Sequence, residues 1–200
     1  MQKQNYMLLF EKQLNDIKEL NNRPSLLLHA CCAPCSSYVL ECLNEYFDIT
    51  IYFYNPNIAP KDEFDYRAEE LKRLVKEMPL KNKVSVVIEE YIPELFEAIA
   101  KGKENELERG SRCTDCYRIR LEKTAEYAEK NGFDYFSTTL SISPYKDAER
   151  LNNIGISLEN TAKWLYSDFK KKNGYKRSIE LSQIYNLYRQ NYCGCAYSKR

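Results

Sequence analysis

Short apolar segments alternate with longer amphipathic segments over the first three quarters of the chain. The apolar segments span residues 25–30, 49–54, 84–89 and 133–138, and their lengths are typical of β-strands. The segments between them carry apolar residues at helical spacing. Strands separated by helices need crossover connections, which give a parallel sheet with helices on its faces. The pattern therefore predicts an α/β fold, a Rossmann-like parallel sheet covered by helices.

Three of the predicted strands are followed by segments that can bind ligands. The first strand leads into Cys31 and Cys32, the second into residues 55–57, and the fourth into residues 138–141. Ligands of parallel α/β sheets bind outside the carboxyl ends of the strands. We therefore expect the three segments to meet at one rim of the sheet.

The length and composition fit one globular domain. Of the 200 residues, 44% are hydrophobic and 30% are charged. We expect a single domain, residues 1–200, with an N-terminal helix (1–24), an α/β core (25–162) and a C-terminal segment (163–200). No apolar run is long enough to span a membrane, and the charged first 20 residues do not read as a signal peptide. We expect a cytoplasmic protein with no membrane partner.

The C-terminal segment, residues 163–200, is basic and rich in aromatic residues. It holds nine Lys or Arg and two acidic residues, a net charge of +7 in a chain whose total is +1. Such a mixture suits RNA phosphates and unstacked bases, although a solvated lysine surface over a tyrosine-rich core has the same composition. The candidate phosphate-binding residues are Lys170, Lys171, Lys172, Lys176 and Arg177.

Seven of the eight cysteines fall in three tight groups. The groups are Cys31-Cys32-x-x-Cys35, Cys113-x-x-Cys116 and Cys193-x-Cys195, while Cys42 stands apart and is expected to pack in a core. In a reducing compartment, clustered thiolates indicate metal binding or catalysis. A zinc ion or one 4Fe-4S cluster uses at most four thiolates, so seven indicate a second metal or redox-active thiols. The third group would let the basic segment complete the metal site.

Other interpretations of these cysteines stay open at this point. They could be inert buried residues, a structural Cys₄ zinc site, or a thiol–disulfide relay at Cys32-x-x-Cys35 with a helix starting near Pro34. His29 is the only histidine, which argues against metal sites with two histidines, and we expect it to be a packed residue.

Six motifs occur in order along residues 25–198. They are His29-Ala30-Cys31-Cys32-Ala33-Pro34-Cys35, Tyr54-Asn55-Pro56-Asn57-Ile58, Arg112-Cys113-x-x-Cys116-Tyr117, Thr138-Thr139-Leu140 with Ser143-Pro144-Tyr145-Lys146, Asp168-Phe169-Lys170 with Gly174-Tyr175, and Tyr188-Arg189-Gln190-x-Tyr192-Cys193-Gly194-Cys195-x-Tyr197-Ser198. Together they resemble the QueH family of epoxyqueuosine reductases. The combination is far more specific than any single cysteine pair.

The resemblance implies a reaction and its cofactors. The reaction is the two-electron removal of the epoxide oxygen from epoxyqueuosine at the tRNA wobble position, which gives queuosine and water. The implied cofactors are a 4Fe-4S cluster and an additional metal ion, iron, and the partners are a tRNA carrying epoxyqueuosine and an external electron donor. All seven clustered cysteines are candidate ligands, and their division between cluster and ion stays open: Cys31, Cys32, Cys35, Cys113, Cys116, Cys193 and Cys195.

Polar residues near the motifs complete the candidate site. A proton donor must release the oxygen as water, and Asp115 and Tyr117 are the catalytic candidates. Donors that could hold the base or a phosphate, each of which could equally be a cap or surface residue, are Asn55, Asn57, Tyr66, Arg67, Tyr145 and Lys146.

Two other functions fit part of the sequence. A zinc-stabilised RNA-binding module would use four thiolates and leave three idle. An iron-sulfur tRNA sulfur-transfer enzyme would need a glycine-rich ATP loop after the first strand. That position holds Cys31-Cys32-Ala33-Pro34-Cys35, without glycine, which disfavours ATP chemistry.

Overall fold

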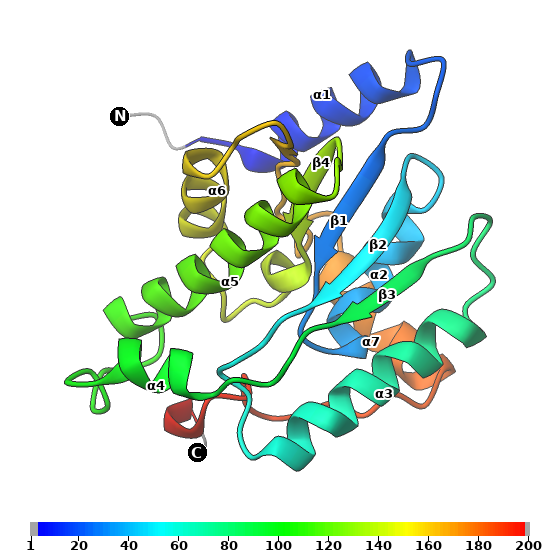
Figure 1. Ribbon diagram of the computed structural model, residues 1–200. Coiled ribbons are helices and arrows are strands. Elements are labelled where there is room, and N and C mark those ends of the chain that lie inside the picture. Colours follow the sequence, from blue (N-terminus) through cyan, green and yellow to red (C-terminus); the bar gives the residue numbers. More distant parts are fainter. Residues whose placement is uncertain (1–3, 199–200) are drawn as a thin grey trace.

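A parallel β-sheet lies at the centre of the molecule (Figure 1). The computed structural model describes residues 4–198, and within them five strands pair in the order β3-β2-β1-β4-β5. The predicted α/β fold is confirmed, and four strands lie within two residues of their expected bounds. The strands are β1 (Ser25–His29), β2 (Asp48–Phe53), β3 (Ser85–Ile88), β4 (Tyr135–Thr138) and β5 (Lys163–Trp164).

Helices cover both faces of this sheet. One face carries α1 (Tyr6–Lys18), α2 (Ala33–Leu43) and α3 (Lys61–Glu77), with α7 (Gly174–Ile184) packed on α2. The other carries α5 (Ser111–Lys130) and α6 (Ala148–Ser157), with α4 (Glu94–Ala100) beside α5. Two short 3₁₀ helices, η1 (Thr139–Ile142) and η2 (Ala196–Ser198), complete the elements. None of the helices in residues 4–198 has both the length and the hydropathy needed to span a bilayer.

The side-chain alternation of β1 builds two hydrophobic cores. Leu26 and Leu28 pack with residues of α1, α2 and α3, whereas Leu27 packs with residues of α5 and α6. Successive residues of a strand point to opposite faces, and a strand covered on both faces needs an unbroken apolar run. This requirement explains the unbroken run of leucines in β1.

The rim of the sheet forms where β1 and β4 pair. His29 is in register with Thr138, so the chain leaves both strands side by side at their carboxyl ends. β2 and β3 lie on one side of this pair and β5 on the other, which makes it the point where the direction of strand order reverses. The loop after β1 and η1 after β4 therefore face the same space.

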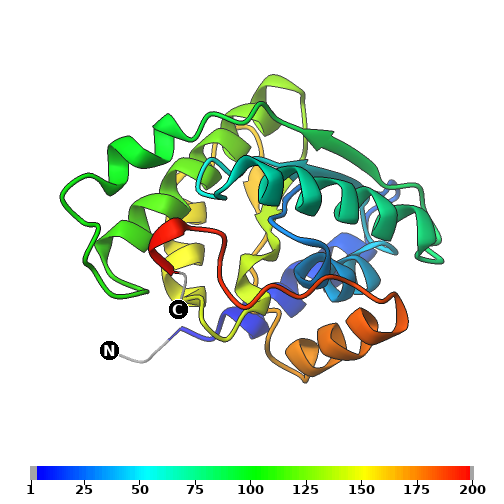
Figure 2. The ribbon, with the colours of Figure 1, turned by 90° about the horizontal axis from the view of Figure 1, so that it is seen from below.

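The C-terminal segment returns across this rim (Figure 2). After α7 the chain runs as a loop to η2, and the backbone N–H of Ala59 donates to the carbonyl of Gly194 at 2.9 Å. Gly194 has φ +105°, and a Cβ atom there would lie 2.8 Å from Cγ1 of Ile58. A residue without a side chain is needed at this contact, which holds the last cysteines over the sheet.

Candidate metal centre and substrate pocket

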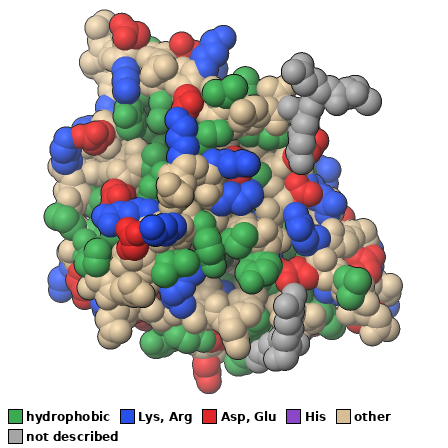
Figure 3. Space-filling view, turned by 180° about the vertical axis from the view of Figure 1, so that it is seen from behind, with side chains coloured by type: hydrophobic (Ala, Val, Ile, Leu, Met, Phe, Trp, Pro, Cys, Tyr) green, Lys and Arg blue, Asp and Glu red, His purple; other side chains and the backbone are tan. Residues whose placement is uncertain are grey.

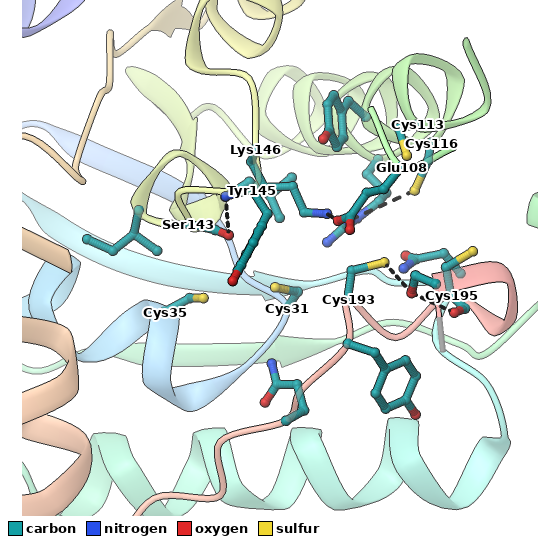
Figure 4. A pocket seen from close by; sticks show the side chains of 18 of the residues that line it. Cys31, Cys35, Glu108, Cys113, Cys116, Ser143, Tyr145, Lys146, Cys193 and Cys195 are labelled. Carbon is teal, nitrogen blue, oxygen red and sulfur yellow. Dashed lines mark hydrogen bonds and ion pairs between the residues drawn. The ribbon is translucent and has the colours of Figure 1, made fainter. Parts of the chain in front are cut away.

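A cavity of about 450 Å³ opens at the carboxyl end of the sheet. Its walls come from the β1–α2 turn, α5, the segment after η1 and the C-terminal loop, and Figure 4 shows their side chains around one space. Members of all three cysteine groups line it: Cys31, Cys35, Cys113, Cys116, Cys193 and Cys195. Residues of the segments after β1, β2 and β4, namely Cys31, Asn57 and Leu140, line the same cavity, so the expected meeting of these segments at one rim is observed. The C-terminal segment contributes as well, through Cys193 and Cys195.

The first cysteine group wraps the start of α2. The Sγ atoms of Cys31, Cys32 and Cys35 all lie within 4.8 Å of one another. Cys32 is the extended residue before the helix, and Pro34 occupies its first turn, where a missing N–H costs nothing. The N-terminal end of a helix also favours negative charge, so this turn suits thiolates.

The remaining four cysteines come from two elements. Cys113 and Cys116 are three residues apart on α5 and therefore share one face of it. Cys193 and Cys195 lie on the loop before η2, and Cys195 packs with Cys116 in a small cluster that includes Phe96. The Sγ of Cys193 lies 3.0 Å from the hydroxyl of Ser198.

The donor set fits thiolate-bound metal. All eight cysteines are free thiols, and three of the sulfur atoms are close enough to share one metal centre. Hydrogen bonds from the Cys32 and Cys35 thiols lower the pKa of Cys31, and a hydrogen bond from Cys195 lowers the pKa of Cys193. The first and third groups thus each favour a first negative charge on one sulfur, which suits cation binding. Burial raises the pKa of Cys116 in the second group.

Lys146 brings a buried positive charge to the cavity wall. Only 7% of the residue is exposed, and its Nζ donates to Oε1 of Glu108 at 3.0 Å. The same nitrogen lies 6.0 Å from the centre of the Tyr117 ring. Burial opposes the charge of Lys146, but negative groups around it, Cys193 and Glu108 among them, outweigh burial and raise its pKa, so the ammonium persists.

A family model described as "Epoxyqueuosine reductase QueH" matches residues 26–200. The chain belongs to the QueH family of epoxyqueuosine reductases. It is 44% identical over 203 residues to the QueH of Streptococcus pyogenes serotype M1, covering 100% of this chain and 80% of the relative. It is 36% identical over 177 residues to the QueH of Thermotoga maritima, covering 87% of this chain and 90% of the relative. QueH relatives are named as enzymes, oxidoreductases of tRNA modification.

Solved structures share the fold of this QueH chain at low sequence identity. The U34-tRNA thiolase NcsA from Methanococcus maripaludis, described with its [4Fe-4S] cluster, gives a TM-score of 0.53 at 13% identity, covering 98% of this chain and 69% of that one. The NMN synthetase from Francisella tularensis gives a TM-score of 0.50 at 10% identity, and the alignment covers 96% of this chain and 77% of the synthetase chain. These likenesses show the fold alone.

Several QueH motif residues expected at the rim do line the cavity. Asn57, Tyr145, Lys146 and Tyr117 are among its walls. The side-chain oxygen Oδ1 of Asn57 is buried and has no hydrogen-bond partner within residues 4–198, and the same holds for the hydroxyl of Tyr117. Unpaired buried polar atoms in a cavity wall are ready to bind a ligand.

Three other candidates lie behind the wall or outside it. Asn55 is buried behind the cavity, where it donates to the carbonyl of Ala30 at 2.9 Å. Arg67 lies under the C-terminal loop, with its guanidinium 5.2 Å from the centre of the Tyr192 ring. Tyr66 is 51% exposed and packs edge-on against Tyr188, outside the cavity lining.

The structure does not bring Asp115 to the cavity. Its carboxylate forms an ion pair with Lys103, and the residue is absent from the cavity lining. The segment between Cys113 and Cys116 is helical, and a residue two positions after Cys113 points to a different side of the helix. Of the two expected proton donors, only Tyr117 faces the cavity.

The basic residues of the C-terminal segment are largely paired. Lys170 binds Asp168 at 2.6 Å, Arg177 binds Glu41 at 2.9 Å, and Lys172 pairs with Glu11. Lys170, Lys171 and Lys172 line a second cavity of about 600 Å³ beside α1, while Lys176 is exposed and outside both cavities. Figure 3 shows Lys and Arg interspersed with acidic and apolar side chains on the back of the molecule. Trp164 and Phe169 belong to the cores, so these two rings cannot stack on bases.

Some cavity residues were not among the sequence-based candidates. Glu108 pairs with Lys146, and Gln190 has a buried Oε1 without a partner in the described part of the chain. Arg120 also lines the cavity, and its position four residues after Cys116 on α5 was a signal that could have identified it.

Proposed function

We propose that this protein reduces epoxyqueuosine at the wobble position of tRNA, removing the epoxide oxygen as water to leave queuosine. Membership of the QueH family supports the reaction. The observation that carries the proposal is the convergence of three cysteine groups, from distant parts of the chain, on one cavity of about 450 Å³. A cavity of this size accommodates a modified base.

We infer that the seven clustered cysteines hold a 4Fe-4S cluster and an additional iron ion. Four thiolates suffice for one cluster, so the surplus supports a second centre. When bound, the cluster supplies electrons and the iron ion withdraws electron density from the epoxide oxygen. The electrons come from an external donor.

The polar residues of the cavity support recognition of the modified base. The free acceptors Asn57 Oδ1 and Gln190 Oε1 suit hydroxyl and N–H donors of the substrate. Tyr145, at the exposed edge of the cavity, and Tyr175 offer flat rings for stacking.

Two residues on one wall suit the departing oxygen. The Lys146 ammonium offsets negative charge as it develops on the oxygen, and burial strengthens this effect. The Tyr117 hydroxyl, buried and unpaired within the described residues, holds a proton at the same wall. We propose that Tyr117 passes this proton to the oxygen, and that the second proton of the departing water comes from solvent.

The tRNA would approach over the mouth of the cavity. Lys171 is exposed beside the second cavity, near Lys172, and both suit phosphates of the anticodon arm. Because Lys172, Lys170 and Arg177 already have acidic partners, phosphate binding there requires exchange of an ion pair.

The proposed function is tested by anaerobic purification followed by iron and sulfide analysis and assay on epoxyqueuosine-containing tRNA. We expect brown protein that converts the tRNA nucleoside to queuosine, detected by mass spectrometry after digestion. The same tRNA without the modification is the matched control. Colourless protein that holds one zinc, binds tRNA and gives no queuosine would instead establish the zinc-stabilised RNA-binding module.

A further inference from the structure

Arg120 carries a positive charge in the protein interior. The residue is 3% exposed and lies one helical turn after Cys116 on α5. Its Nη2 donates to Oδ1 of Asn55 at 2.6 Å, its Nε donates to Nε2 of His29 at 3.2 Å, and its Nη1 lies 3.9 Å from Sγ of Cys116. The guanidinium is therefore fixed from three directions.

None of these contacts supplies a negative carboxylate. Within residues 4–198, no ion pair joins Arg120 to Asp or Glu, whereas two other buried cations near the site have one: Arg67 pairs with Glu63, and Lys146 with Glu108. A third, Arg112, donates from Nη1 to the backbone carbonyls of Lys103 and Glu104. His29 cannot supply a negative charge either, because an imidazole side chain is neutral or positively charged. A buried cation is strongly unfavourable without an opposite charge nearby, so Arg120 needs a different anion.

The cysteine sulfurs are the candidate anions closest to Arg120. Arg120 lines the same cavity as Cys31, Cys116 and Cys193, one cysteine from each of the three groups. Arg120 is therefore placed between the β1–α2 turn and the α5 cysteines.

We propose that Arg120 is the counter-charge of the metal–thiolate centre and sets its reduction potential, an inference that rests on the proposed function. A fixed positive charge and an N–H directed at a ligand sulfur both favour the reduced, more negative state of the centre. Arg120 is a positioning residue in this role, because it acts on the centre and not on the substrate. Asn55 and His29 hold it in place.

The test compares wild type with Arg120→Gln, Arg120→Lys and Arg118→Gln, all purified anaerobically with measured iron and sulfide. The midpoint potential is measured by redox titration followed by electron paramagnetic resonance. Arg118 is the matched control, because it lies on the same helix but is exposed and pairs with Glu122. We expect Arg120→Gln to lower the equilibrium constant for reduction about tenfold, or about 59 mV for one electron. Arg120→Lys and Arg118→Gln should stay within about threefold of wild type.

The outcomes separate this inference from the proposed function. Wild-type protein without iron and sulfide would overturn both. A loaded Arg120→Gln variant with the wild-type potential would overturn the counter-charge alone. If Arg120→Gln loses its iron, the Arg120→Lys variant decides. Retained iron with a reduction potential near that of wild type supports the role of charge. Loss of iron from Arg120→Lys, or a reduction potential lowered by the amount expected for Arg120→Gln, rejects it.

Discussion

The Nζ atom of Lys146 lies 3.0 Å from Oε1 of Glu108 on the wall of the cysteine-lined cavity. Both side chains are largely buried, so each charge depends on the other. Lys146 also faces Tyr117, the proposed proton donor. The pair therefore holds a fixed positive charge beside the proposed proton donor.

Removal of the Lys146 charge should reduce turnover. We expect Lys146→Met to lower kcat by about 100-fold, the loss typical of removing one group that stabilises developing negative charge. Iron and sulfide content should be retained. Lys123→Met, an exposed lysine on α5, is the control and should keep wild-type turnover. Full activity of Lys146→Met would remove Lys146 from the reaction.

Substitution of the clustered cysteines and substitution of Cys42 should have opposite effects on activity and iron content. We expect Cys→Ala substitution at Cys31, Cys32, Cys113, Cys116, Cys193 or Cys195 to abolish turnover and lower iron content, because each removes a thiolate ligand. Cys42→Ala should keep iron and activity and cost about 1 kcal/mol of stability through lost packing, since Cys42 packs half-buried against the first core. Metal analysis and urea unfolding measure both effects. An inactive Cys42→Ala beside an active Cys113→Ala would place the centre elsewhere.

Binding of tRNA should depend on Lys171 and Lys172. We expect Lys171→Ala/Lys172→Ala to weaken binding and to reduce the slope of log affinity against log salt by about 0.9 per lost phosphate contact. Single-turnover rates at saturating protein should not change. Lys81→Ala/Lys83→Ala is the matched control, because these lysines lie before β3, at the opposite end of the sheet. Equal slopes for wild type and the Lys171/Lys172 variant would show that these lysines form only a solvated surface.

Glu70 should make docking of the C-terminal segment sensitive to acid. Its carboxylate binds Arg73 and accepts the backbone N–H of Tyr188 at 2.9 Å, and the Arg73 hydrogen bond is the main cause that lowers its pKa. A lowered folded-state pKa gives stability that is present above the unfolded pKa, about 4.3, and is lost as pH falls through the folded value.

The matched variant is Glu70→Gln. We expect it to be about 1–2 kcal/mol less stable than wild type at pH 7, with a difference that shrinks below about pH 4 as the wild-type carboxyl protonates. Chemical denaturation at pH 7 and pH 3 measures this. A difference that does not change with pH would assign the effect to packing and not to charge.

The sequence predicted those parts of the fold that depend on a simple local pattern of apolar and polar residues. Strand length and apolar runs located β1 to β4, and strand–helix alternation placed the segments after β1, β2 and β4 at one rim. β5 was missed because the two residues Lys163 and Trp164 are too short to show a period. Some aromatic rings of the C-terminal segment lie in the core and others at the surface. Composition alone cannot predict which rings are buried and which are exposed.

Asp115 and Arg120 show that the face of the helix on which a residue lies decides whether the residue reaches the cavity. Both lie close to cysteines in the sequence, but only residues three or four apart share a helix face. Asp115 therefore turns toward Lys103, and Arg120 turns toward Cys116. The sequence-based candidates therefore included Asp115 and omitted Arg120, because they were chosen before the segment was known to be helical.

The loop that carries Cys193 and Cys195 follows all five strands and belongs to none of them. The sheet can therefore stay fully paired while this loop detaches, and detachment would open one wall of the cavity. Partial, local unfolding needs far less free energy than unfolding of the domain. If the proposed centre forms, metal would accordingly enter or leave a protein whose core remains intact, and the lifetime of the centre would depend on the docking of one loop more than on the stability of the fold.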